Sequence, residues 1–150
     1  MADALPAKRR LRLLIVDDEP EIRRLVAVSV ARALPEIDVS QEGTGADALA
    51  RLAKEPADFI LSDFRMPGMD GLEFLQRSIA LAPQASRIMV TAYPDTMLAI
   101  RALNEGHIAR FLTKPFSPRD MVDALRALLA KREAAEAKAL GLAKAFAGAG

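Results

Sequence analysis

The chain has 150 residues, of which 51% are hydrophobic and 27% charged, and these values are typical of one globular domain. A formal net charge of +1 excludes a global field that steers nucleic acid or anionic lipid, and the lack of cysteine excludes disulfides, thiol nucleophiles and thiolate metal sites. The sequence shows no signal-type segment and no run of about 18 apolar residues, so we expect a cytoplasmic protein that does not bind a membrane.

After a polar lead-in of residues 1–10, short apolar runs alternate with helical patterns. The apolar runs lie near 11–16, 38–41, 58–62, 87–91 and 110–114, and the helical patterns near 20–34, 45–55, 70–82, 95–105 and from 117 onward. In the first helical segment Ile22, Leu25 and Val26 recur at steps of three and four, and Pro20 suits the first turn. Five strand–helix pairs with short connections predict an α/β fold, with helices on both faces of a doubly wound parallel sheet.

The last helical segment is longer than the sheet requires. Residues up to about 130 suffice to cover the sheet, so the domain is predicted over 11–130 and a helical extension with a flexible end over 131–150. Apolar residues and alanines continue along the extension in a heptad-like register. Two interpretations stay open: a fraying alanine-rich tail, or a dimerising helix or linker that leads to an output module.

Charged residues follow three of the predicted strands. Asp17 and Asp18 follow the first apolar run, Asp63 follows the third and Lys114 ends the fifth. The carboxyl ends of parallel strands lie along one edge, where open α/β folds bind ligands, so we expect these side chains to converge. Carboxylates ~4 Å apart repel by about 4 kcal/mol per pair at an effective dielectric near 20. They must therefore take up protons or bind a divalent cation, and all-oxygen ligands favour Mg²⁺ or Mn²⁺ over zinc.

The same residues suit phosphoryl transfer. A carboxylate can act as a nucleophile and form an acyl phosphate, and the reaction needs an in-line oxygen and positive charge on the phosphoryl oxygens. Asp63 supplies that oxygen in this hypothesis, while the metal and Lys114 supply the positive charge. Thr91 ends the fourth apolar run, where its hydroxyl can donate to a phosphoryl oxygen.

Four motifs in this order and spacing resemble the receiver domain of bacterial two-component response regulators. They are Asp17-Asp18-Glu19, the segment 63–71, Thr91-Ala92 and Lys114-Pro115-Phe116. The resemblance covers roughly residues 11–130 and implies a flavodoxin-like sheet with strand order 2-1-3-4-5. It also implies a phosphorylation-dependent signalling switch, in which Asp63 accepts a phosphoryl group from a phosphohistidine on a sensor histidine kinase or a histidine phosphotransfer protein.

The resemblance assigns ligands to the site. It implies that Mg²⁺ is held by the side chains of Asp17, Asp18 and Asp63 and by the backbone carbonyl of Arg65. It implies that the phosphoryl group is bound by Lys114, Thr91 and Ala92.

The resemblance also assigns residues that respond to phosphorylation. Thr91 and Phe111 would switch together and reshape the face formed by the fourth helix, fifth strand and last helix, which is also the expected surface for a homodimer. Arg65 and Tyr93, two residues beyond the acceptor and the threonine, would set the lifetime of the phosphate.

Other functions make different demands on the sequence. The leading prediction is a phosphoacceptor that catalyses only its own phosphorylation and dephosphorylation and is not an enzyme in the usual sense. An aspartyl phosphohydrolase needs a second acid–base Asp where this chain has Arg65, and a flavodoxin-like cofactor binder needs a Gly/Ser/Thr-rich loop at residues 17–20. A degenerate receiver that acts only as a binding module is disfavoured by the intact acidic set. We expect no direct binding of nucleic acid, because no DNA-reading segment follows the domain.

Overall fold

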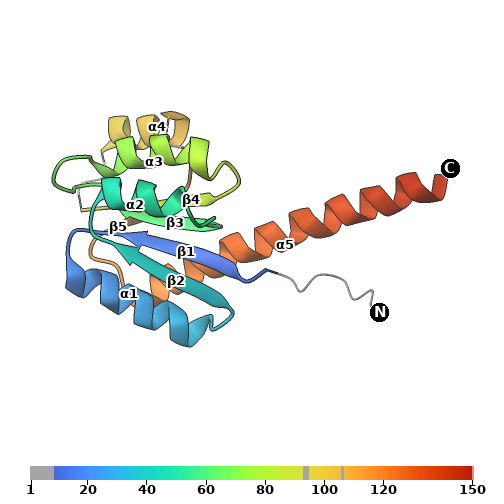
Figure 1. The fold of residues 1–150 in the computed structure, drawn as a ribbon, viewed down its shortest axis with the longest axis horizontal. Coiled ribbons are helices and arrows are strands. Elements are labelled where there is room, and N and C mark those ends of the chain that lie inside the picture. Colours follow the sequence, from blue (N-terminus) through green and yellow to red (C-terminus); the bar gives the residue numbers. More distant parts are fainter. Residues whose placement is uncertain (1–8, 93–94, 106, 150) are drawn as a thin grey trace.

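The computed structural model describes residues 9–92, 95–105 and 107–149 (Figure 1). Its five strands form one parallel sheet in the order β2-β1-β3-β4-β5, and this confirms the predicted fold class. The strands are β1 Leu11–Val16, β2 Ile37–Glu42, β3 Phe59–Asp63, β4 Ser86–Thr91 and β5 Ile108–Thr113. The helices are α1 Pro20–Ala33, α2 Gly45–Leu52, α3 Gly71–Leu81, α4 Thr96–Glu105 and α5 Pro118–Ala149.

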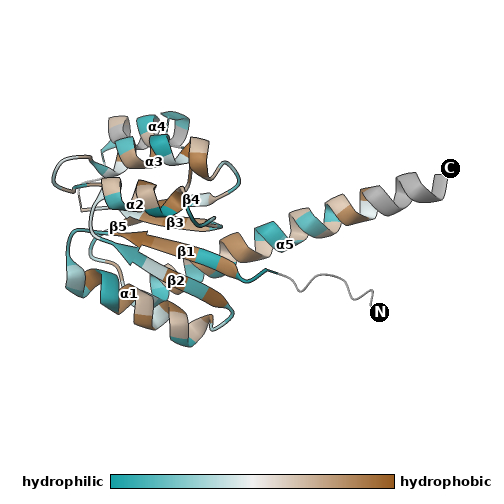
Figure 2. Cartoon of the chain, in the orientation of Figure 1, coloured by the Kyte–Doolittle hydropathy of each residue, from teal (hydrophilic) through white to brown (hydrophobic). Residues whose placement is uncertain are grey.

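The sheet is covered on both faces. Helices α1 and α5 lie on one face, and α2, α3 and α4 lie on the other (Figure 1). Alternate residues of β1 enter the two cores: Leu14 and Val16 pack under α2 to α4, while Leu13 and Ile15 pack under α1 and α5. Because both faces are covered, β1 and β3 are almost continuously apolar, and they appear brown in Figure 2.

Several helices begin at residues whose side chains accept a backbone hydrogen bond. Thr44 Oγ1 accepts from Asp47 N at 3.0 Å, and Asp70 Oδ1 accepts from Glu73 N at 2.8 Å. At α5, Ser117 Oγ accepts from Asp120 N at 3.1 Å, while Asp120 Oδ2 accepts from Ser117 N at 3.0 Å, which is a reciprocal capping arrangement. These contacts fix where α2, α3 and α5 begin.

Two boundaries differ from the predicted ones by more than a residue. Helix α2 ends at Leu52 and not at 55, because Lys54 N and Glu55 N both bond back to Arg51 O and close the last turn. Strand β5 begins at Ile108 and not at 110, because Ile108 pairs with β4 and is buried. The exposed residues at 109 and 110 obscure this start in the hydrophobic pattern.

Helix α5 has 32 residues and extends far beyond the sheet (Figure 1). Its buried residues end at Leu128, and residues 133–142 are all exposed. The predicted domain boundary near 130 stays a prediction, but Arg132 lies beyond it and still contacts the sheet. Its Nη2 donates to Asp58 Oδ1 at 2.9 Å, and its guanidinium carbon lies 5.8 Å from the centre of the Phe59 ring.

Candidate functional site

The register of the sheet brings the ends of four strands to one edge. Val16 pairs with Ser62, so the residues that follow β1 lie beside Asp63 at the end of β3. Asp63 pairs with Val90, and Thr91 pairs with Thr113, which places the residue after β5 beside the end of β4. The strand ends therefore bring together Asp17, Asp18, Asp63, Thr91 and Lys114, residues that lie far apart in the sequence.

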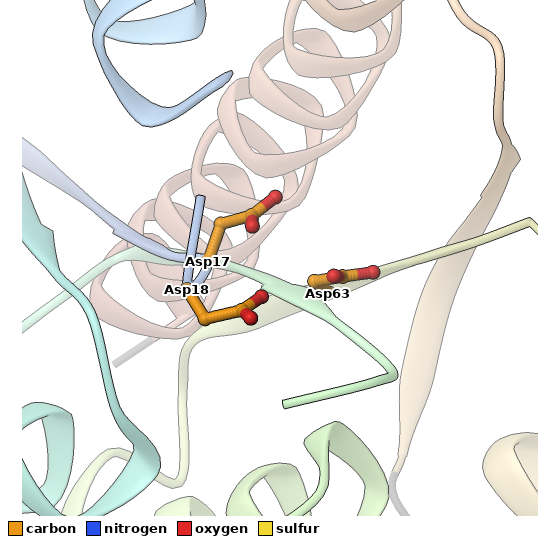
Figure 3. Close-up of side chains that lie close together, drawn as sticks. All are labelled: Asp17, Asp18 and Asp63. Atoms are coloured by element: carbon orange, nitrogen blue, oxygen red, sulfur yellow. The ribbon is translucent and has the colours of Figure 1, made fainter. Parts of the chain in front are cut away.

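Three carboxylates meet at this edge (Figure 3). One oxygen from each of Asp17, Asp18 and Asp63 lies within 4.8 Å of the others. Asp17 and Asp63 are only 4% and 6% exposed, whereas Asp18 faces solvent. Two ionised carboxylates at this separation repel by about 3 kcal/mol at an effective dielectric near 20. The cluster is thus favourable only if protons or cations reduce its charge.

Lys114 supplies one positive charge to the cluster. Its Nζ lies 3.3 Å from Asp63 Oδ2 and 3.7 Å from Asp17 Oδ2, and Glu19 Oε1 is 4.0 Å away. One ammonium group among several carboxylates leaves net negative charge in the pocket. The remaining negative charge favours the binding of a second cation.

The protonation equilibria reflect this imbalance. Burial raises the pKa of Asp17 to about 6, and the neighbouring charge of Asp63 acts in the same direction, while the bond from Glu19 N–H opposes them. Burial also raises the pKa of Asp63, although the nearby Lys114 charge partly offsets it. For Lys114, burial favours the neutral amine, but the charges of Asp17 and Asp63 together raise its pKa above the ordinary value. The pocket therefore favours bound positive charge.

The chemistry of these donors fits the Mg²⁺ that the sequence predicts. The ligands are oxygens, no histidine or cysteine belongs to the cluster, and two of the carboxylates are buried where their mutual repulsion is strong. Asp17, Asp18 and Asp63 would hold the ion. Arg65 lies exposed in the loop after β3, and the role of its backbone carbonyl as a ligand stays a prediction.

The loop after β3 packs closely against the acceptor strand. A Cβ placed on Gly71 would lie 2.1 Å from the carbonyl oxygen of Asp63 and 2.8 Å from Phe64 Cα. Gly71 N also donates to Phe64 O at 2.7 Å. Only glycine permits this approach, so Gly71 allows the start of α3 to pack against the end of β3, which carries Asp63. The sequence shows a glycine here but does not indicate which backbone it approaches.

Of the predicted phosphate-binding and switch residues, Thr91 and Ala92 lie at the end of β4, whereas Phe111 lies within β5. Thr91 is 2% exposed, Ala92 follows it and is exposed, and Lys114 N donates to Thr91 O at 2.9 Å, which ties the end of β5 to β4. Phe111 is half-buried and packs against the core beneath α2 to α4. Tyr93, predicted to set the phosphate lifetime, lies outside the described residues.

An apolar groove of about 460 Å³ opens beside the site. It lies between α1 and the loop that connects β5 to α5, and Lys114 and Ala92 border it at the end next to the carboxylates. Leu25 and Ile22 of α1 form one wall, and Pro115 and Phe116 form the other. The side chain of Leu25 is 55% exposed, so it presents apolar surface to solvent in this groove.

The sequence of the chain matches a known protein family. The family described as "Response regulator receiver domain" matches residues 13–126. The response regulator protein PilR of Pseudomonas aeruginosa is 40% identical over 106 residues, which cover 71% of this chain and 23% of PilR. The cyclic di-GMP phosphodiesterase response regulator RpfG of Xanthomonas campestris pv. campestris is 34% identical over 128 residues, which cover 84% of this chain and 34% of RpfG. The chain thus spans about a quarter to a third of the length of these relatives.

Solved structures give the same result. A response regulator receiver domain protein (CheY-like) from Methanospirillum hungatei JF-1 matches with a TM-score of 0.77 and 29% identity, covering 83% of this chain and 98% of that one. No helix in the described part of the chain combines the length and apolar character needed to cross a membrane. The cytoplasmic location stays a prediction.

Proposed function

The chain belongs to the response regulator receiver domain family, and on that premise we propose that it is a signalling switch that accepts a phosphoryl group on Asp63. Receiver domains of two-component systems work in phosphorylation-dependent signalling, so the coarse function follows from the family. The finer proposal concerns the donor, the cofactor and the response. It is supported above all by the convergence of Asp17, Asp18, Asp63 and Lys114 at one edge of the sheet.

The donor in this proposal is a phosphohistidine on a sensor histidine kinase or a histidine phosphotransfer protein. An oxygen of the Asp63 carboxylate forms the new P–O bond while the P–N bond of the donor breaks, and the electron pair of that bond stays on the imidazole, which takes up a proton. Lys114 Nζ, already 3.3 Å from Asp63 Oδ2, binds an oxygen of the transferred group. When bound at the three carboxylates, Mg²⁺ offsets negative charge on the phosphoryl oxygens.

The groove beside the site is where the donor would dock. A phosphohistidine must present its phosphorus to Asp63 in line with the breaking bond, and the groove ends at Lys114 and Ala92 next to that carboxylate. Its apolar walls, with the exposed Leu25, suit the apolar side chains of a helical donor domain. Asp18, which does not line the groove, is exposed to solvent.

The response to phosphorylation would begin at Thr91. The new group carries up to about −2 charge, and it would draw the Thr91 hydroxyl toward it. Because Thr91 is buried and Lys114 N is bonded to its carbonyl oxygen, the movement would be transmitted to β5, where Phe111 lies half-buried. The face of α4, β5 and α5 would then change, and a homodimer through that face stays a prediction.

The two relatives named above share this segment, although only RpfG is described as a phosphodiesterase. Because PilR and RpfG share this segment but differ in description, we infer that the segment is a switch that controls another part of a protein. It would not itself turn over a substrate. We therefore propose that this chain is a phosphoacceptor that catalyses only its own phosphorylation and dephosphorylation.

The test is incubation with Mg²⁺ and acetyl phosphate, followed by treatment of the labelled protein with acid or base. We expect an acid-stable, base-labile phosphate in the wild type and none in Asp63→Asn. Asp70→Asn is a matched control, because Asp70 lies in the same loop but caps α3 through Glu73 N. Steady hydrolysis of p-nitrophenyl phosphate would instead identify a phosphohydrolase, and no adduct from any phosphodonor would indicate a binding module.

A further inference from the structure

Arg23 on α1 contacts the loop that carries two of the three carboxylates. Its Nη1 donates to the carbonyl oxygen of Asp17 at 2.6 Å. Asp17 N donates to Glu42 O at 3.2 Å, so both backbone polar atoms of Asp17 are held from outside the loop. Asp17 Oδ1 also accepts from Glu19 N at 2.9 Å, which orients the carboxylate itself.

The guanidinium of Arg23 also meets a second loop. A Cβ placed on Gly43, just after β2, would lie 3.1 Å from Arg23 Nη1, so the backbone between β2 and α2 packs directly against this group. Arg23 Nε is buried without a hydrogen-bond partner among the described residues. Burying an unpaired donor is unfavourable, whereas Nη1 of the same guanidinium is paired with the Asp17 carbonyl oxygen.

We propose that Arg23 is a positioning residue for Mg²⁺, which fixes the Asp17–Asp18 peptide so that both carboxylates face Asp63. The three carboxylates, whose oxygens lie within 4.8 Å of one another, repel, and a loose loop would relax by moving them apart. The bond to the Asp17 carbonyl opposes that movement. Groups that orient the ligands of a metal in this way typically change its affinity by about 10–100-fold when they are removed.

Charge and position predict opposite effects of removing Arg23, and this makes the inference testable. Loss of a positive charge near the pocket would by itself strengthen the binding of a cation. Loss of the hydrogen bond would loosen the loop and weaken binding. Weaker binding by an uncharged variant therefore identifies positioning as the dominant effect.

The experiment measures the Mg²⁺ dissociation constant of the full chain by calorimetric titration, together with thermal melting with and without Mg²⁺. For Arg23→Ala we expect a dissociation constant about tenfold higher than the wild type. Arg23→Lys keeps a donor but not the planar fork, so it should fall between the two. Gly43→Ala, which crowds the guanidinium, should weaken binding in the same direction by a smaller factor.

Arg24→Ala is the matched control, because Arg24 is the next residue of the same helix, is exposed and donates only weakly to Pro20 O at 3.4 Å. It should leave the dissociation constant unchanged. If Arg23→Ala lowers the melting temperature equally with and without Mg²⁺ while its dissociation constant stays within about twofold of the wild type, Arg23 is only structural and the inference fails. The inference rests on the proposed Mg²⁺ site. If the wild type binds no Mg²⁺, both the Mg²⁺ site and the positioning role of Arg23 are wrong. If the wild type and Arg23→Ala bind Mg²⁺ equally well, only the positioning role of Arg23 is wrong.

Discussion

Replacing the buried carboxylate of Asp58 should lower the stability of the fold. Asp58 lies just before β3, at the sheet edge opposite the phosphoacceptor, and its side chain is 2% exposed. Both Nη atoms of Arg9 donate to it at 2.8 and 2.9 Å, Arg132 Nη2 donates at 2.9 Å, and Arg12 N donates at 2.9 Å. One buried carboxylate therefore ties the segment before β1 and the extended part of α5 to the sheet.

Asp58→Asn removes the charge but keeps the shape of this side chain. Breaking a buried ion pair typically costs about 3–5 kcal/mol, but Arg9 is 50% exposed and Arg132 23% exposed, so water can partly replace the lost partner. We expect a loss of about 2–3 kcal/mol in the free energy of unfolding, measured by urea titration and circular dichroism. At ~2–4 °C per kcal/mol for a chain of this size, the melting temperature should fall by about 4–12 °C.

The pH dependence provides a second check of the same contact. Burial alone would raise the pKa of Asp58, but the hydrogen bonds from Arg9 and from Arg12 N, with the charges of Arg9 and Arg132, lower it below its ordinary value. The contribution of Asp58 is therefore complete above the unfolded-state pKa of about 3.9 and is lost as the pH falls through the lower folded-state value. The stability difference between wild type and Asp58→Asn should be constant from pH 7 to 5 and shrink below pH 4.

Asp38→Asn is the control, because Arg10 Nε donates to Asp38 Oδ1 at the same distance of 2.8 Å. Both side chains of that pair are at least 50% exposed, so its removal should cost less than about 1 kcal/mol. Equal losses in the two variants would refute the argument that burial gives Asp58 its greater effect.

Three further predictions follow from the site and the last helix. Lys114→Met should slow phosphorylation by acetyl phosphate about 10²-fold at saturating Mg²⁺, because it removes a charged donor from the phosphoryl oxygens, and a normal rate in a stopped-flow assay would contradict this role. Gly71→Ala should lower the free energy of unfolding by about 1–3 kcal/mol, because the added Cβ clashes with the Asp63 carbonyl oxygen. At Gly141 an added Cβ meets no atom within 4 Å, so Gly141→Ala should increase the helicity measured by circular dichroism. Removing residues 134–150 should leave both stability and phosphorylation unchanged. Removing residues 132–150 should lower the free energy of unfolding by about 1–2 kcal/mol, because it also deletes Arg132, which bonds to Asp58. Equal melting temperatures for the two truncations would contradict the contribution of this contact.

The sequence predicts the strands and the site for the same physical reason. Strand β3 is buried on both faces, so its apolar run is unbroken, and the acidic residue at its end stands out. Parallel strands then bring such ends to one edge, which is why the sequence alone predicts that Asp17, Asp18, Asp63 and Lys114 meet. The exposed residues of β5 weaken the same signal, and its first residues are missed.

Residues whose roles depend on two distant segments could not be predicted in this way. Arg23 looks like an ordinary helical arginine until the Asp17 carbonyl and Gly43 lie against it. Asp58 looks like the polar start of a strand, although its partners lie 49 and 74 residues away. Periodicity reports which face of an element is buried, but it carries no information on which polar groups from other segments will meet there.

The most direct test of the central claim is mass spectrometry of the intact protein after incubation with phosphoramidate and Mg²⁺, followed by peptide mapping. The account predicts a single added phosphoryl group, located on Asp63, that does not form when the Mg²⁺ is chelated. A group found on another residue, or one that forms equally well without Mg²⁺, would contradict it.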